Sequence, residues 1–81
     1  MDSQRLLDSF TRILRDLLDD DTIVLTEETT RGDVPDWDSF NYVNFIVAVE
    51  SEFGIKFRIA DVEAFETVGD IVADALSRLD R

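Results

Sequence analysis

The chain has 81 residues, of which 44% are hydrophobic, and a formal net charge of −11 at pH 7. A chain of this length forms one small domain with a modest core, so we take residues 1–81 as a single domain. It contains no cysteine and no histidine, which excludes disulfides, thiolate nucleophiles, the usual zinc sites and the imidazole base of a conventional serine triad. It also lacks a hydrophobic run of membrane-spanning length and the features of a signal peptide, so we expect a cytoplasmic protein without membrane insertion.

The negative charge lies outside the first eighteen residues. Residues 1–18 contain three arginines and three aspartates, whereas residues 19–81 contain five basic and sixteen acidic residues. Such a surface repels nucleic acid and anionic lipid, and it attracts basic patches on other proteins. A generally solubilising surface would explain the charge equally well.

The first helix is predicted over residues 3–18, because its hydrophobic residues recur every three or four positions and Ser3 can cap it. These positions are Leu6, Leu7, Phe10, Ile13, Leu14, Leu17 and Leu18. The acidic triplet at residues 19–21 ends the helix, because carboxylates oppose the dipole at a helix C-terminus. The triplet does not fit a calcium loop, because Ile23 and Val24 stand where that pattern needs a ligand and a glycine.

Residues 19–38 form a long connection with Gly32 and Pro35 as breakers. The hydrophobic residues expected to anchor it are Ile23, Val24, Leu25 and Val34. A loop of this length in a small domain is usually functional or mobile. Here it would carry the chain across the bundle and deliver Ser39 to an exposed corner.

The second helix is predicted from Ser39 to about Phe53 and ends at Gly54. Asp38 can cap it and leave Ser39 at the first helical position. Unpaired backbone N–H groups and the positive end of the helix dipole favour a bound anion there. Judged on Asp38 and Ser39 alone, an ordinary helix start explains the pattern better than a binding site.

At about 100° per residue, the hydrophobic positions of this helix fall into two groups. The group expected to enter the core comprises Tyr42, Phe45, Ile46, Val49 and Phe53. The group beside Ser39 comprises Phe40, Val43 and Val47, and it shares its face with Asn44, Glu50 and Ser51. The second face is either a docking surface for a partner protein or a more deeply buried side, and the pattern alone does not separate the two.

Residues 55–59 alternate hydrophobic and polar side chains, but a lone strand has no partner in this chain. We therefore expect an extended loop that holds Ile55, Phe57 and Ile59 against the core. A single short helical turn is predicted over residues 61–65.

Thr67 and Asp70 have the spacing of a capping box, which introduces a last helix from Val68 to about Leu79. The hydrophobic face of that helix comprises Val68, Ile71, Val72, Ala75, Leu76 and Leu79. The expected fold is all-α, a small bundle of three main helices plus one short helix, with a long loop between the first two.

Three blocks of the sequence, in this order, resemble the acyl carrier protein family. They are Asp38-Ser39-Phe40, residues 53–57 (Phe-Gly-Ile-Lys-Phe) and residues 65–72 (Phe-Glu-Thr-Val-Gly-Asp-Ile-Val). The resemblance covers roughly residues 3–79. In that family an Asp-Ser-Leu motif starts the second helix, and its serine carries a 4′-phosphopantetheine arm. The resemblance therefore implies Ser39 as the attachment residue, with Asp38 beside it in the cofactor site.

The resemblance also implies a carrier rather than an enzyme, with no metal of its own. A phosphopantetheinyl transferase, using coenzyme A and magnesium, would let the Ser39 hydroxyl attack the pyrophosphate and acquire the arm. The thiol of the arm would hold acyl groups as thioesters. A monomeric carrier would shuttle them between ligases, synthases and acyltransferases of fatty-acid, lipid or polyketide biosynthesis.

The implied docking residues are Phe40, Val43, Asn44, Val47 and Glu50. Carriers of the fatty-acid type tend to have acidic residues on this helix, whereas this chain has Asn41 and Asn44, so its docking is expected to be less electrostatic. Phe40 replaces the usual leucine of the family, and Asp36 stands where the family often has glycine. An acyl chain sheltered by the protein would lie among Phe45, Ile46, Val49, Phe57, Val62 and Phe65, although core packing explains these residues equally well.

Two alternatives keep the same fold. A peptidyl or aryl carrier would use Ser39 in the same way for a different cargo, although the strong acidity favours the acyl type. An unmodified helical interaction domain would use only the face of Phe40, Val43 and Val47. A hydrolase with a Ser39 nucleophile is disfavoured, because Lys56 is the only lysine and no histidine is present.

Overall fold

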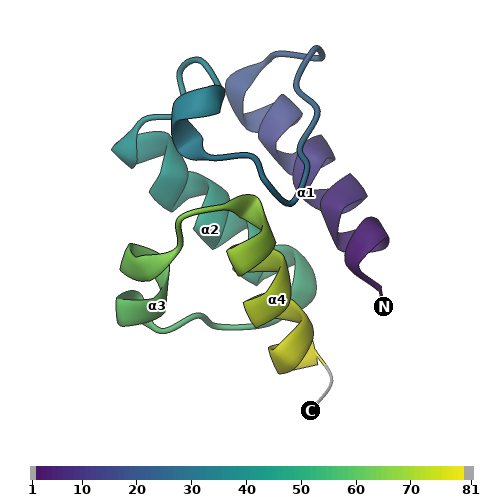
Figure 1. Cartoon of the computed structure of the whole chain (residues 1–81), viewed down its shortest axis with the longest axis vertical. Helices are drawn as coiled ribbons and strands as arrows, with labels where there is room; N and C mark the ends of the chain where they lie inside the picture. Colours follow the sequence, from purple (N-terminus) through teal and green to yellow (C-terminus); the bar gives the residue numbers. More distant parts are fainter. Residues whose placement is uncertain (1, 80–81) are drawn as a thin grey trace.

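The computed structural model describes residues 2–79, which form four α-helices and one short 3₁₀ helix. The helices are α1 (Ser3–Leu18), η1 (Arg31–Asp33), α2 (Ser39–Phe53), α3 (Ile59–Ala64) and α4 (Val68–Leu79). α1 packs against both α2 and α4, and the short α3 lies to one side of the bundle (Figure 1). The predicted bundle of three main helices and one short helix is confirmed. No helix within residues 2–79 combines the length and the hydrophobicity needed to cross a membrane.

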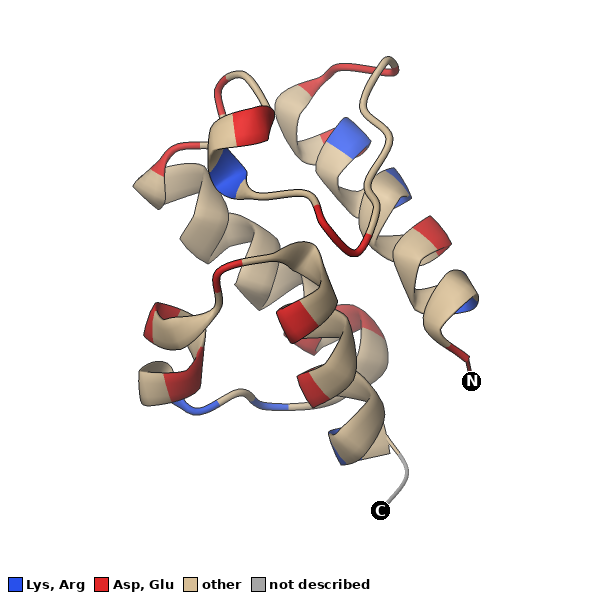
Figure 2. Ribbon diagram, in the orientation of Figure 1, with Lys and Arg blue, Asp and Glu red and all other residues tan. Residues whose placement is uncertain are grey.

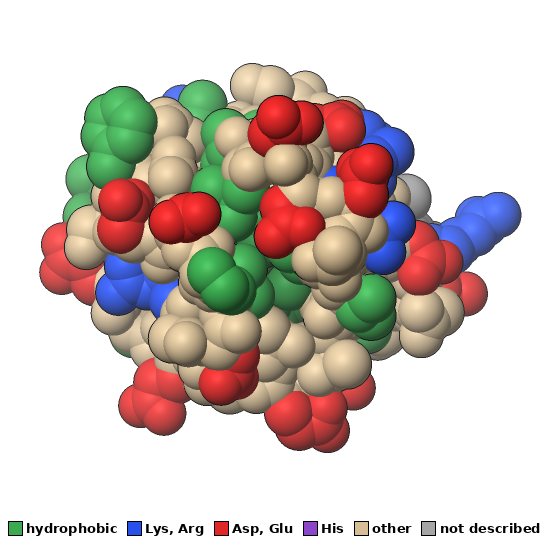
Figure 3. All heavy atoms as spheres, turned by 90° about the horizontal axis from the view of Figure 1, so that it is seen from above, with side chains coloured by type: hydrophobic (Ala, Val, Ile, Leu, Met, Phe, Trp, Pro, Cys, Tyr) green, Lys and Arg blue, Asp and Glu red, His purple; other side chains and the backbone are tan. Residues whose placement is uncertain are grey.

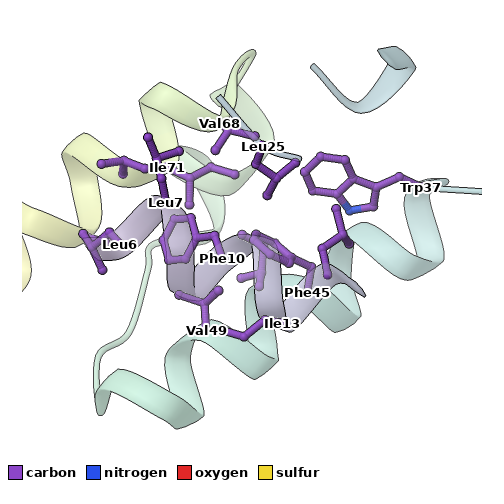
Figure 4. Packing of buried hydrophobic residues seen from close by; sticks show 14 of the residues in the cluster. Leu6, Leu7, Phe10, Ile13, Leu25, Trp37, Phe45, Val49, Val68 and Ile71 are labelled. Carbon is purple, nitrogen blue, oxygen red and sulfur yellow. The ribbon is translucent and has the colours of Figure 1, made fainter. Parts of the chain in front are cut away.

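The core is built from the hydrophobic helix faces that the sequence predicts. Its largest fully buried side chains are Phe10, Phe45, Leu6, Leu14, Ile71, Val49, Val68 and Val72. The rings of Phe10 and Phe45 meet edge to face with their centroids 5.6 Å apart, which joins α1 to α2 (Figure 4). On α2, Phe45, Ile46 and Val49 are buried as predicted, whereas Tyr42 and Phe53 are only partly buried against the same core.

Trp37 is a core residue that the sequence analysis did not identify. Its side chain is only 4% exposed, and its ring centroid lies 5.3 Å from that of Phe45 (Figure 4). An aromatic residue of this size stabilises the fold mainly through the area that it buries. Because Trp37 stands two positions before Ser39, its burial fixes the end of the long loop against α2.

Two predicted core contacts are wrong. Val24 is 68% exposed, whereas Ile23 and Leu25 on either side are buried. The reason is that successive side chains of an extended segment point in opposite directions. Ile59 is 78% exposed, because α3 begins at this residue and ends the alternation on which its predicted burial depended.

The first helix has the predicted limits, but its predicted cap is wrong, and the short helix is shifted. α1 is capped by Asp2 rather than Ser3, because the Asp2 carboxylate accepts the N–H of Arg5 at 2.9 Å. The short helix covers Ile59–Ala64 instead of residues 61–65, and Phe65 already has extended backbone angles.

The predicted ends of α1 and α2 are confirmed. Asp19, the first residue of the acidic triplet, and Gly54 both adopt the left-handed conformation, with φ values of 52° and 65°. The N–H of Asp19 donates to the carbonyl of Arg15, and that of Gly54 donates to the carbonyl of Glu50. These bonds pair carbonyl groups that would otherwise have no partner at a helix end.

The loop between α1 and α2 is tied to the start of α4. The backbone N–H groups of Val68 and Gly69 donate to the carbonyl oxygens of Thr29 and Glu27, at 2.8 and 2.9 Å. A Cβ atom on Gly69 would lie 2.8 Å from the Glu27 carbonyl oxygen, so this close approach requires glycine. The loop therefore crosses the bundle, as predicted, and its last part reaches the N-terminal end of α2 (Figure 1).

Candidate functional site

Ser39 is exposed at the first position of α2, directly after its cap. The Asp38 carboxylate accepts the backbone N–H of Asn41 at 2.9 Å, which confirms the predicted capping role of Asp38. The side-chain amide of Asn41 donates to the carbonyl of Asp36 at 2.9 Å. The Ser39 hydroxyl therefore stands at a helix start that is fixed on both sides.

The backbone before Ser39 turns through Asp36, whose φ of 68° lies in the left-handed region. Glycine is the usual residue there, and aspartate is among the few others that adopt this conformation readily. Asp36 stands where the acyl carrier protein family often has glycine. Because aspartate also adopts this conformation, the turn that presents Ser39 is kept.

Arg31 of η1 brings a cation next to Ser39. Its Nη1 atom lies 3.5 Å from the Ser39 Oγ atom, and its guanidinium carbon lies 4.7 Å from the centroid of the Tyr42 ring. The Tyr42 hydroxyl donates to the carbonyl of Val62 at 2.7 Å, which fixes the ring from the side of α3. Burial raises the pKa of the Tyr42 hydroxyl, an effect that the charge of Arg31 partly opposes.

This cation stands in an acidic part of the molecule. Arg31 is the only lysine or arginine between residues 16 and 55, a stretch with eleven acidic residues. Figure 2 shows basic residues on α1, on α4 and in the α2–α3 loop, and a basic position in η1 with acidic positions around it. Figure 3, which looks onto this end of the bundle, shows acidic side chains spread over the face. Arg31 and the positive end of the α2 dipole together form a small region of positive charge on a negatively charged surface.

A cavity of about 320 Å³ adjoins this region. It lies between the α1–α2 loop, α2 and the junction of α3 with α4. Its lining includes the aromatic side chains of Trp37, Tyr42 and Phe65 as well as the polar side chains of Arg31 and Glu66. Sequence spacing did not identify Trp37 and Tyr42 as cavity residues, because only the fold-back of the loop brings them beside Phe65.

The six residues predicted around an acyl chain lie in different places. Phe65 lines the cavity, and its ring packs edge to face on Phe57 with the centroids 5.7 Å apart. Phe45, Ile46 and Val49 are buried in the core between the helices, and Val62 is half-buried on α3. The structure thus brings Phe57 and Phe65 together.

The predicted docking residues divide into exposed and internally bonded ones. Phe40, Val43 and Val47 are 74%, 55% and 52% exposed, and Asn44 is half-buried between them. Glu50 is half-buried, and its carboxylate accepts the backbone N–H of Phe57 at 2.8 Å. The exposed hydrophobic surface of α2 therefore consists of Phe40, Val43 and Val47.

The site fits a phosphate ester on Ser39. The hydroxyl is accessible, it lies at the positive end of a 15-residue helix, and a guanidinium is already within 3.5 Å. These donors suit a negatively charged phosphodiester, which is the group that joins 4′-phosphopantetheine to a serine. That arm would bring a thiol to a chain that has no cysteine.

Sequence comparison identifies close relatives. Residues 4–74 match the family model described as a phosphopantetheine attachment site. The chain is 41% identical over 61 residues to an acyl carrier protein of Thermotoga maritima, with 75% of each chain covered. It is 30% identical over 73 residues to an acyl carrier protein of Lactobacillus acidophilus, which covers 90% of this chain and 91% of that protein.

The fold agrees with these relatives. It is similar to the solution structure of a holo acyl carrier protein from Geobacter metallireducens, with a TM-score of 0.86 and 40% identity over 93% of this chain and 86% of that one. Members of this family are carriers rather than catalysts, they interact with biosynthetic enzymes, and their prosthetic group is covalently bound 4′-phosphopantetheine. By sequence and by fold, the chain belongs to the acyl carrier protein family.

Proposed function

We propose that Ser39 is the residue that carries the 4′-phosphopantetheine arm, and that the protein shuttles acyl groups as thioesters between enzymes of fatty-acid, lipid or polyketide biosynthesis. The observation that carries this proposal is the exposed Ser39 hydroxyl at the first position of α2, with the Arg31 guanidinium 3.5 Å away. The thiol of the arm supplies the acyl-carrying chemistry. The residues of the chain hold its point of attachment, since Asp38 caps α2 and buried Trp37 fixes the loop before it.

Ser3 offers an internal control for this proposal. It too follows an aspartate cap and stands at the first position of a helix, α1. It differs from Ser39 because it is half-buried and because its motif continues with Gln4 instead of a hydrophobic residue. A helix start with an Asp-Ser pair is therefore present twice in this chain, and the proposal assigns the arm to only one of them.

Intact-protein mass before and after incubation with coenzyme A, magnesium and a broad-specificity phosphopantetheinyl transferase tests the assignment. We expect the wild type and Ser3→Ala to gain one phosphopantetheine, and Ser39→Ala to gain none. A gain in Ser39→Ala would move the attachment to another residue. No gain in the wild type with several transferases would favour the unmodified interaction domain instead.

We further propose that the transferase and the acyl-processing enzymes dock on the exposed surface of Phe40, Val43 and Val47. The support is their exposure at spacings of three and four residues along one face of α2, beginning one residue after Ser39. Phe40→Ala is expected to lower the second-order rate of arm transfer by about tenfold, because a single anchoring side chain contributes more than about 1 kcal/mol. Val24→Ala, which removes another exposed hydrophobic side chain, is the control and should leave that rate unchanged.

We propose an acyl group, rather than an aminoacyl or aryl group, as the cargo. We place an acyl chain among Phe45, Ile46, Val49, Phe57, Val62 and Phe65, a placement supported by the contact of Phe57 with Phe65 and by the position of Phe65 in the cavity. Loading the holo protein with octanoyl and with benzoyl groups and comparing the side-chain NMR shifts tests it. If neither the octanoyl nor the benzoyl group changes the shifts of Phe57 and Phe65, the proposed placement of the acyl chain is contradicted. Changes with the benzoyl group alone would favour the aryl carrier.

The same proposal places the carrier in the cytoplasm, where coenzyme A is available, as a monomer. A net charge of −11 makes separate copies repel one another, which supports the monomer. Light scattering at two protein concentrations checks the oligomeric state, and cell fractionation checks the location.

A further inference from the structure

Arg31 is a cation without a carboxylate partner among the described residues. The ion pairs within residues 2–79 involve Arg12, which joins α1 to Glu52 of α2, and Arg78, which joins α4 to Asp61 of α3. Arg31 forms none of them, although eleven acidic residues share its part of the sequence. Within residues 2–79, the hydrogen bond of its guanidinium goes to the uncharged hydroxyl of Ser39, at the long distance of 3.5 Å. The N–H groups of this guanidinium are therefore free to bind an anion.

The position of Arg31 is held by the fold rather than by an ion pair. The guanidinium lies over the Tyr42 ring at 4.7 Å, within the range of a cation–π interaction. Tyr42 is anchored in turn through its hydroxyl bond to Val62. The segment that carries Arg31 is fixed as well, because the Asp33 carboxylate accepts the N–H of Thr30 at 3.0 Å. The cation is thus placed at Ser39 before any ligand arrives.

A phosphodiester on Ser39 would meet repulsion as well as attraction. Asp36 and Asp38, three residues and one residue before Ser39, are exposed carboxylates. A negative group next to them needs a compensating positive charge, and the dipole of α2 supplies only part of it. Arg31 is the one basic side chain in this part of the chain that can supply the rest.

We propose that Arg31 binds the phosphodiester of the arm on Ser39 and so holds the first part of the arm against α2 and the rim of the adjoining cavity. The inference rests on the proposed attachment at Ser39. A guanidinium suits this role because its planar set of N–H donors matches two phosphate oxygens at once. Arg31 and Tyr42 both line the cavity, so an arm held by Arg31 begins at its edge.

The test compares apo and holo forms of the wild type, Arg31→Met, Arg31→Lys and Arg5→Met. Methionine keeps a straight apolar side chain without the charge. Arg5 is an exposed arginine on α1. Arg5→Met therefore changes the net charge by the same amount as Arg31→Met, but on a different helix from Ser39. Two quantities are measured for each protein, the difference in midpoint temperature between holo and apo forms and the ³¹P NMR line width of the phosphodiester.

We expect the holo-minus-apo midpoint difference to be about 2–4 °C lower in Arg31→Met than in the wild type, as for the loss of an exposed ion pair in a domain of this size. The phosphodiester signal should become narrower in that variant, because the group is no longer held. Arg31→Lys should lie between the two, and Arg5→Met should match the wild type. In about 1 M salt, where the Debye length is near 3 Å, the holo-minus-apo midpoint differences of all the variants should become similar.

The apo form serves as the reference for each variant, so a general loss of stability in Arg31→Met does not affect the comparison. Equal midpoint differences and equal line widths in Arg31→Met and the wild type would overturn the role of Arg31, while the attached arm, seen by mass, would leave Ser39 as the attachment residue. A wild type that gains no arm would overturn both the proposed attachment and this inference.

Discussion

The starts of α2 and α4 each have an aspartate carboxylate that accepts backbone N–H groups, but they are organised in opposite ways. At the start of α4, the N–H groups of Val68 and Gly69 are bonded to carbonyl groups of the long loop, and Asp70 accepts the N–H groups of Glu66 and Thr67. At the start of α2, Asp38 accepts the N–H of Asn41, and within residues 2–79 no acceptor bonds the N–H groups of Ser39 or Phe40. One helix start is closed by the fold, and the other is open to solvent.

This difference shows what turns a helix start into a site. Every α-helix begins with unpaired N–H groups and a positive dipole end, so these features alone do not distinguish α2 from α4. The distinction comes from the loop between α1 and α2, which covers the start of α4 with Glu27 and Thr29 and brings Arg31 to the start of α2. The same loop therefore closes one helix start and equips the other.

Gly69→Ala is the most direct way to break the closed start. The new Cβ atom would lie 2.8 Å from the Glu27 carbonyl oxygen and 3.2 Å from the Glu27 Cβ atom, so the loop and α4 must move apart. Overpacking by an added methyl group lowers the free energy of unfolding by about 1–3 kcal/mol, while the higher helix propensity of alanine raises it by up to about 1 kcal/mol. We expect the free energy of unfolding to fall by about 1–2 kcal/mol, which urea unfolding measures.

Gly32→Ala is the matched control for that substitution. A Cβ atom on Gly32 meets only the Thr30 hydroxyl at 3.8 Å, which is ordinary contact, so stability should change by less than about 0.5 kcal/mol. If both variants unfold at the same urea concentration as the wild type, the close approach of the loop to α4 does not hold in solution.

Asp38→Ala removes the only side chain that caps the open start. The Asn41 N–H then loses its acceptor, and loss of such a cap usually costs about 1 kcal/mol. Asp38→Asn keeps an oxygen acceptor and should lower the free energy of unfolding by only a few tenths of about 1 kcal/mol. Circular dichroism during urea unfolding compares the two. Equal losses in both variants would mean that the charge of Asp38, rather than its hydrogen bond, stabilises α2.

The sequence predicted the closed start better than the open one. The Thr67 and Asp70 spacing identified the capping box, and the Thr67 hydroxyl indeed accepts the N–H of Asp70 at 3.2 Å. Helix limits and core faces followed from periodicity in the same way, because they depend on neighbours three or four residues apart. Asp38 and Ser39 were recognisable for the same local reason.

What the sequence did not predict depends on contacts distant in the chain. Arg31 is eight residues from Ser39, and no local spacing rule links them, because η1 and the turn at Asp36 must both form first. Trp37 was missed since its neighbours Asp36 and Asp38 are exposed, so the surrounding pattern indicates a surface loop. Val24 was misplaced because it points away from its buried neighbours in an extended segment, and Ile59 because α3 begins there and ends the alternation.

Asp70→Asn should give the smallest effect, and it tests the closed start through pH. The backbone N–H groups of Glu66 and Thr67 donate to the Asp70 carboxylate and lower its pKa below the ordinary value of 3.8. A group whose pKa is lower in the folded state adds stability that is complete above its unfolded pKa and is lost as the pH falls through the folded value.

The wild type should therefore be more stable than Asp70→Asn at pH 7, and this difference should shrink as the pH falls from about 4 towards 2. Other carboxylates of this acidic chain titrate in the same range, but they do so in both proteins, so only the difference between the two unfolding curves reports on Asp70. The effect is small because the loop carbonyls of Thr29 and Glu27 still hold the N–H groups of Val68 and Gly69. A difference that stays constant with pH would mean that the Asp70 carboxylate does not accept these bonds in solution, and that the loop alone closes the start of α4.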